Sequence, residues 1–161
     1  NKIVCICIGN TLTLMKEREK AYSYFEKALK MEGDNYKAYI CYAISLSEFG
    51  EYEMAVEMYK KAEKIKPKEI EAQILLANLY TNFNHLDLAM DLYKQALRIK
   101  PNSAQTYMLL GNAHYLKGEI EQAIASYRSS INIAPENDEY RLVYTQLLDE
   151  YIDKKRNGER V

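Results

Sequence analysis

Residues 36–67 read YKAYICYAISLSEFGEYEMAVEMYKKAEKIKP, and this stretch decides the fold. It has two halves with apolar residues at helical spacing, separated by a break at Gly50. Ala43 lies in the first half and Ala55 in the second, and small side chains at these places allow two helices to cross closely. Ala62 and the tyrosine three residues before it share a face that this hairpin leaves uncovered. The stretch therefore predicts a helical hairpin on which a following hairpin packs.

The same pattern recurs along the chain at an interval of 34 residues, as 89 − 55 and 123 − 89 both show for Ala55, Ala89 and Ala123. Ala21 continues this series towards the N-terminus. Further sets at the same interval are Gly9, Ala43, Ala77 and Gly111; Phe25, Tyr59, Tyr93 and Tyr127; Ala28, Ala62, Ala96 and Ser130; and Gly33, Pro67, Pro101 and Pro135.

This periodic pattern resembles the tetratricopeptide repeat (TPR), a helix–turn–helix unit of about 34 residues. The matching pieces are YICYAISL and ILLANLY, each followed by A-x3-Y-x2-A-x4-P, and YMLLGNAHY, followed by A-x3-Y-x2-S-x4-P. The first copy is weaker, with Cys5 in place of a large aromatic residue and Gly33 in place of proline. The resemblance implies an all-α fold, a right-handed superhelical solenoid of antiparallel helix pairs with about four TPR motifs and a C-terminal capping helix.

The repeat register divides the chain into six parts. We expect a weak first repeat, three strong repeats, a capping helix and a charged flexible tail, at residues 2–35, 36–69, 70–103, 104–137, 138–153 and 154–161. The expected helices are 2–15, 18–31, 36–48, 52–65, 70–82, 86–99, 104–116, 120–133 and 138–153. The first helix of each repeat is called its A helix and the second its B helix.

Composition excludes several classes of partner. The chain of 161 residues is 48% hydrophobic and 28% charged, which suits a soluble domain. Its formal net charge is −1 and its pI about 6.2, so we expect no nucleic-acid partner. The apolar run at residues 3–8 is far shorter than the roughly 20 residues of a membrane helix, so we expect no direct membrane insertion.

Cysteine use points to a reducing compartment. Cys5, Cys7 and Cys41 form no CxxC pair and are odd in number, which is unlike a secreted disulfide framework. We expect inert buried thiols and a cytoplasmic or similarly reducing location. The sequence begins without Met and directly in the first expected helix, so we expect a fragment of a longer protein, whose targeting this stretch does not define.

The chain carries no recognisable catalytic or metal-binding motif. His85 falls in an expected turn, and His114 occupies the position that Leu12, Leu46 and Tyr80 hold in the other repeats, which predicts a packing role. Cys5 and Cys7 are two residues apart on an expected helix and point about 200° from each other, so they cannot share one metal ion. We therefore expect no enzyme activity, no cofactor and no metal.

The resemblance to TPR proteins implies a binding groove lined by the A helices. We expect the row Ile6, Ile40, Ile74 and Met108 to be exposed and to signal a partner. Asn10, Asn78 and Asn112 share a second position, from which an amide can hold a peptide backbone. The complete set of expected partner-binding residues is Ile6, Asn10, Lys37, Ile40, Ile44, Glu71, Ile74, Asn78, Gln105, Met108, Asn112 and Tyr115.

The repeat register argues against one sub-class of TPR protein, the co-chaperones. TPR co-chaperones that bind the acidic C-terminus of heat-shock chaperones use a carboxylate clamp of Lys, Arg and Asn side chains. The corresponding positions here hold one asparagine and otherwise unsuitable residues, namely Ile6, Asn10, Cys41, Glu71 and Leu75. We expect the chain not to bind such a tail.

Three functions agree with this sequence. The first is a non-enzymatic interaction module or scaffold that binds a peptide or helix of a partner protein in its concave groove. The second is a self-associating TPR scaffold, which would make the chain a homo-oligomer. The third is the substrate-docking arm of a larger enzyme, such as a TPR-bearing glycosyltransferase.

Overall fold

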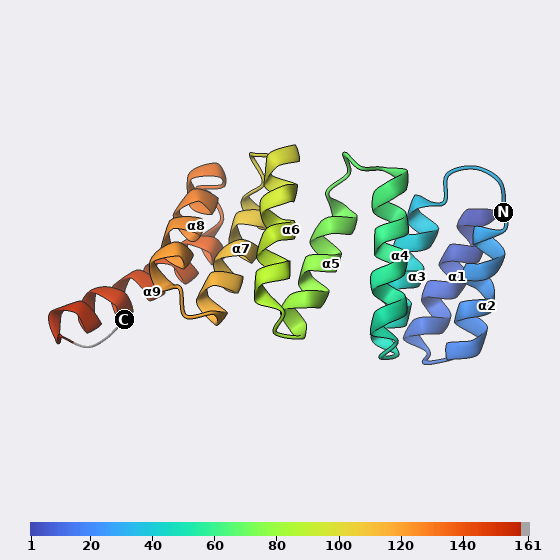
Figure 1. Cartoon of the computed structure of the whole chain (residues 1–161), viewed down its shortest axis with the longest axis horizontal. Coiled ribbons are helices and arrows are strands. Elements are labelled where there is room, and N and C mark those ends of the chain that lie inside the picture. The colour runs from blue at the N-terminus through green and yellow to red at the C-terminus, as the bar shows by residue number, and fades with distance from the viewer. Residues whose placement is uncertain (159–161) are drawn as a thin grey trace. The chain divides into compact units, whose positions relative to one another are not determined.

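The computed structural model describes residues 1–158, and over this range the chain forms nine helices and no strand (Figure 1). The helices are α1 (Lys2–Leu14), α2 (Arg18–Leu29), α3 (Tyr36–Glu48), α4 (Tyr52–Ile65), α5 (Glu71–Asn82), α6 (Leu86–Ile99), α7 (Ala104–Leu116), α8 (Ile120–Ile133) and α9 (Asp138–Arg156). The predicted fold class, an all-α array of TPR helix pairs followed by a terminal helix, is confirmed.

The chain divides into two compact units, which are described separately. The first is Asn1–Leu76 and the second begins at Ala77, so the boundary falls inside α5. In the first unit α1 pairs with α2 and α3 with α4, and both α1 and α2 pack on α3. In the second unit α7 pairs with α8, while α6 packs on α7 and α9 on α8.

Small side chains lie at the helix crossings, as the repeat pattern predicts. Ala43 and Ala55 are both 0% exposed in the first unit, and Ala89 and Ala123 are 0% exposed in the second. Aromatic rings fill the space between consecutive repeats of the first unit, where Tyr42 lies 5.4 Å from Phe25 and 5.3 Å from Tyr22 between ring centroids. Close crossings and interlocked rings together build a continuous core in this unit.

The turn inside each helix pair requires a left-handed residue. The position two residues before each B helix holds Lys16, Gly50, Asn84 and Gly118, with φ of 61°, 83°, 60° and 82°. Glycine adopts this conformation without a steric penalty because it lacks Cβ, and asparagine tolerates it better than most other residues. The break read at Gly50 is therefore a backbone requirement of the turn.

Lys2 holds the turn that follows the first repeat, where the other repeats have proline. Its Nζ donates to the backbone oxygens of Glu32 at 3.0 Å and Asp34 at 3.1 Å, and to Oδ1 of Asn35 at 2.6 Å. Gly33 adopts φ of 96° in the same turn. Three hydrogen bonds from one ammonium group thus fix a segment that lacks the restriction of a proline ring.

Helix α9 covers the last repeat and extends further than predicted. Its Leu147 is buried in one cluster with Met108, Ala123 and Tyr127. The helix ends at Arg156, three residues beyond the expected end, so part of the segment 154–161 is helical. Lys154 pairs with Glu150 at 2.6 Å, and basic residues in the last turn also suit the negative end of the helix dipole. Residues 159–161 of the expected tail lie outside the described range.

Candidate protein-binding face

The expected exposed apolar row is wrong at Ile40. This side chain is only 2% exposed and lies in a buried cluster with Tyr36, Ala62 and Ala72. Ala62 comes from α4 and Ala72 from α5, so the B helix of the same repeat and the next A helix both close over the isoleucine. A residue that its own hairpin leaves open is therefore covered by the following repeat.

The expected exposure of the row is also wrong at Met108, in the second unit. It is 8% exposed because Ala123 and Tyr127 of α8 and Leu147 of α9 pack against it. Ile6 and Ile74 are half-buried. Ile40 and Met108 thus lie between helices, and the more exposed side chains of the A helices occupy neighbouring positions.

Charged residues on the A helices and in the turn after α1 form ion pairs. Lys37 Nζ lies 3.0 Å from a carboxylate oxygen of Glu71, as their opposite charges predict. Glu48 pairs with Lys16, which lies in the turn after α1, at 3.4 Å. Both pairs are exposed, so each contributes little to stability and either member can turn to a ligand.

Two of the three asparagines expected to hold a peptide already have partners inside their own repeats. The hydroxyl of Tyr93 donates to Oδ1 of Asn78 at 2.6 Å, and that of Tyr127 to Oδ1 of Asn112 at 2.7 Å. Burial raises the pKa of Tyr127 to about 12, so its hydroxyl keeps the proton that it donates. These two oxygens therefore serve the fold.

Asn10 differs because Phe25 stands where the later repeats have a tyrosine, and a phenyl ring offers no hydroxyl. The Asn10 side chain is exposed, and its amide donates only a long hydrogen bond of 3.7 Å to Sγ of Cys41. Its carbonyl oxygen is consequently available to a ligand in a way that those of Asn78 and Asn112 are not.

A pocket of about 380 Å³ lies beside Asn10, between α1 and α3. Thr13 and Ser45 join the two helices at its base through a hydroxyl contact of 2.7 Å. Ile44 is 40% exposed and Leu14 is 83% exposed. The full lining is Asn10, Thr13, Leu14, Lys16, Cys41, Ile44, Ser45 and Glu48.

The expected partner-binding set contains Asn10 and Ile44 of this lining but not Leu14, Lys16 or Glu48. These three follow the inward positions that were considered, near the C-terminal ends of the A helices. They line the pocket because the C-terminal ends of α1 and α3 lie beside each other. The sequence contains one sign of this pocket. Leu14 is apolar, whereas the second and third repeats have Glu48 and Asn82 at the same position.

A smaller pocket of about 190 Å³ occupies the corresponding place in the second unit, between α7 and α9. Tyr115, an expected site residue, is 47% exposed at its edge. Glu150 holds the repeat position of Glu48. The remaining lining residues are Tyr127, Val143, Gln146 and Leu147. Gln105, also expected to contact a partner, is exposed but does not line this pocket.

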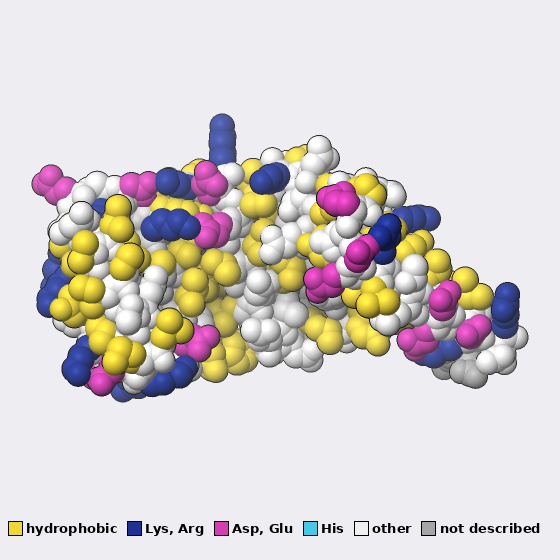
Figure 2. All heavy atoms as spheres, turned by 180° about the vertical axis from the view of Figure 1, so that it is seen from behind, with side chains coloured by type: hydrophobic (Ala, Val, Ile, Leu, Met, Phe, Trp, Pro, Cys, Tyr) yellow, Lys and Arg dark blue, Asp and Glu magenta, His cyan; other side chains and the backbone are white. Residues whose placement is uncertain are grey.

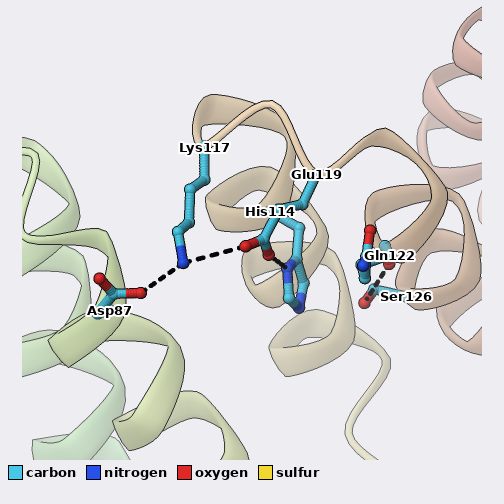
Figure 3. Close-up of polar contacts among 6 residues, drawn as sticks. All are labelled: Asp87, His114, Lys117, Glu119, Gln122 and Ser126. Carbon is cyan, nitrogen blue, oxygen red and sulfur yellow. Dashed lines mark hydrogen bonds and ion pairs between the residues drawn. The ribbon is translucent and has the colours of Figure 1, made fainter. Parts of the chain in front are cut away.

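A polar cluster in the second unit joins α6, α7 and the start of α8 (Figure 3). His114 is 8% exposed, which confirms its predicted burial, and its Nδ1 lies 2.6 Å from Glu119. Lys117 Nζ lies 2.6 Å from Asp87 and 3.0 Å from Glu119. Hydrogen bonds from Lys117 and His114 lower the pKa of Glu119. These contacts link α6, α7 and α8. The sequence did not predict the ion pairs of Lys117 with Asp87 and Glu119.

The described residues contain neither a metal-binding cluster nor a membrane-spanning helix. Over residues 1–158, no three His, Cys, Asp or Glu side chains are grouped closely enough to hold a metal ion. No described helix has the length and apolar character needed to cross a membrane. On the face shown in Figure 2, positive and negative side chains are interspersed with apolar ones. Cys5 and Cys41 are half-buried, while Cys7 is exposed, contrary to the expected burial of all three thiols.

Family models match most of the chain. A model described as "Tetratricopeptide repeat" matches residues 12–79, another with that description matches 104–137, and one described as "TPR repeat" matches 84–118. The chain belongs to the tetratricopeptide-repeat family. No curated protein matches it.

Solved structures share the fold at low sequence identity. MamA 41-end from Desulfovibrio magneticus RS-1 is 20% identical with a TM-score of 0.75, over 98% of this chain and 89% of that one. TTC0263, a thermophilic TPR protein in Thermus thermophilus, is 21% identical with a TM-score of 0.71, over 94% and 83%. The first TPR of Spaghetti (RPAP3), bound to the HSP90 peptide SRMEEVD, is 16% identical with a TM-score of 0.66, over 76% and 97%.

Proposed function

We propose that this TPR protein is a non-enzymatic interaction module that binds an extended peptide of a partner protein on its A helices. The observation that carries the proposal is the pocket between α1 and α3. It combines an exposed isoleucine, Ile44, with the free carbonyl oxygen of Asn10. An apolar side chain of the peptide would enter the pocket while Asn10 accepts a hydrogen bond from the peptide backbone.

The proposal does not include a chaperone tail, although one structural relative holds an HSP90 peptide. A peptide ending in several carboxylates needs a cluster of cationic side chains. At the pocket Lys16 already faces Glu48, and nearby Lys37 faces Glu71. A ligand that is apolar and close to neutral suits this balance of charge.

The three free cysteines support a reducing location such as the cytoplasm, where the chain would act as an adaptor or scaffold. The pairing of His114 with Glu119, which Lys117 also contacts, supports a structural use of the buried histidine. Neither observation favours catalysis.

The experiment is a selection of peptides from a random phage-displayed library, followed by titration of the selected peptides. Ile44→Glu should weaken binding at least tenfold, because a carboxylate would be desolvated beside an apolar ligand. Met54→Glu is the matched control, since Met54 is 43% exposed in the same unit, on α4. Equal affinity of Ile44→Glu and wild type, with both folded, would refute the proposal, as would a selection that yields no binding peptide.

A further inference from the structure

The pocket between α7 and α9 has the same repeat positions as the pocket between α1 and α3. The lining residues of α9 and their counterparts in α3 are Val143 and Cys41, Gln146 and Ile44, Leu147 and Ser45, and Glu150 and Glu48. In the first unit this pocket stays open although α4 follows α3 and packs against it. The second pocket therefore lies on a side of the A helices that a following helix does not close.

The two pockets differ in charge. In the first, Glu48 pairs with Lys16, which stands in the turn after α1 and also lines the pocket. In the fourth repeat the position of Lys16 is held by Gly118, which has no side chain. Among the described residues that line the second pocket, Glu150 is the only charged one. The second pocket thus keeps the carboxylate of the first and lacks its cation.

The two lysines near the second pocket do not replace that cation. Lys117, in the turn after α7, contacts Asp87 and Glu119 (Figure 3). Lys154 lies one turn beyond Glu150 on the same helix, contacts its Oε1 at 2.6 Å and does not line the pocket. An exposed pair of this kind within one helix stabilises weakly, so the Glu150 carboxylate can also bond a ligand.

The groups beside Glu150 suit a planar cation. The ring of Tyr115 is 47% exposed at the pocket edge, and the face of a phenol ring attracts a positive charge. Gln146 is exposed, and its carbonyl oxygen can accept a hydrogen bond. A guanidinium group carries five N–H donors in one plane, so it can bond a carboxylate and stack on a ring at the same time. An ammonium group has no such plane.

We propose that this pocket binds an arginine side chain from a basic peptide of a partner protein, with the guanidinium stacked on Tyr115 and bonded to Glu150. The volume of about 190 Å³ suits a single side chain, because whole-ligand pockets usually measure about 300–1,000 Å³. Residues 138–153 carry five acidic side chains and one arginine, which pairs with Asp138. The surrounding charge therefore also favours a basic peptide. The proposal does not rest on the apolar peptide of the first unit.

Nuclear magnetic resonance titration of the ¹⁵N-labelled chain tests the choice of ligand. The probe is the capped pentapeptide Gly-Gly-Arg-Gly-Gly, compared with the same peptide carrying citrulline, which has nearly the shape of arginine and no charge. The arginine peptide should give saturating amide shifts at Gln146, Leu147 and Glu150, with a dissociation constant on the order of millimolar. The citrulline peptide should bind at least tenfold more weakly, because it makes no charge-assisted hydrogen bond.

Variants test the site. Glu150→Gln should raise the dissociation constant of the arginine peptide at least tenfold. Glu139→Gln is the matched control, since it removes the same charge from the exposed first turn of α9, away from the pocket lining, and should bind as wild type does. Ile44→Glu should also bind the arginine peptide normally, which separates this result from that of the first pocket.

Three results would overturn the proposal. The first is the absence of saturating shifts at the pocket up to about 20 mM of the arginine peptide. The second is equal affinity for the arginine and citrulline peptides. The third is a Glu150→Gln variant that folds, as its amide spectrum reports, and binds the arginine peptide no more weakly than Glu139→Gln does.

Discussion

At the residue scale, the difference between a core residue and a ligand-contacting residue on an A helix is one turn. Ile40 and Ile44 share a helix and an amino-acid type, yet the first is 2% exposed and the second 40%. The next repeat covers Ile40 with Ala72 and leaves Ile44 open beside the pocket. The proposed function therefore assigns Ile40 to stability and Ile44 to binding.

This difference predicts opposite effects of the same substitution. Ile40→Ala should lower the free energy of unfolding by about 2–5 kcal/mol, because it leaves a cavity among Tyr36, Ala62 and Ala72. Ile44→Ala should change it by less than about 0.5 kcal/mol. Urea unfolding followed by circular dichroism measures both. Similar losses for the two variants would contradict the burial described here.

Gly111 provides a second test, because its lack of a side chain admits a neighbouring ring. A Cβ at this position would lie 2.4 Å from an edge carbon of Tyr127, which is 3% exposed and hydrogen-bonded to Asn112. Gly111→Ala should destabilise the chain by about 1–3 kcal/mol through overpacking, although alanine is the better helix former. A thermal melting temperature equal to or above that of wild type would be inconsistent with this close approach.

The Glu119 cluster predicts a dependence on pH. Because Lys117 and His114 lower the pKa of Glu119, folding is favoured by its ionised form. This stabilisation is complete above the ordinary pKa of a glutamate and is lost as the pH falls through the lowered value. Melting temperatures from neutral pH to about pH 3 should therefore fall less steeply in Glu119→Gln than in wild type. Parallel curves would show that the cluster does not couple to folding.

At the scale of elements, α9 acts as a cap on the second unit. It supplies Leu147 to the cluster around Met108, and Tyr151 donates a hydrogen bond of 2.6 Å from its hydroxyl to Glu121 of α8. Terminal helices of this kind keep the last repeat of an array soluble. The helix continues to Arg156, whereas residues 154–161 were predicted to form a flexible tail.

The capping role predicts that two leucines of α9 respond differently to charge. Leu147 is 7% exposed and Leu142 is 56% exposed. Leu147→Glu should destabilise the second unit by about 3 kcal/mol or cause aggregation, because it places an unpaired carboxylate in the cluster. Leu142→Glu should be close to neutral. Light scattering and thermal melting distinguish the two, and a neutral Leu147→Glu would mean that α9 is not a cap.

Most of the fold could be predicted from the sequence, because the period of 34 residues repeats the same helix boundaries and the same small residues at crossings. The candidate site could be predicted only in part. Burial of Ile40 and Met108 depends on the following helix, which a single hairpin does not reveal. The pairing of Asn78 and Asn112 with tyrosines, and its loss at Asn10 beside Phe25, appears only when the helices of one repeat are compared.

At the scale of the whole molecule, the chain is a TPR protein. Its relatives in known structures share the fold at 21% identity or less, so they do not transfer a partner. The function proposed for the chain rests on the pocket between α1 and α3. The central claim is that the pocket binds an apolar peptide.

The most direct measurement is the map of backbone amide shifts in the ¹⁵N-labelled chain on titration with a peptide selected from the library. Shifts should be largest at Asn10, Cys41, Ile44 and Glu48, which line the pocket. They should be small along α4, on which the control residue Met54 lies. Saturating shifts confined to α4, or to residues remote from the pocket lining, would contradict the account and place binding on another face of the molecule.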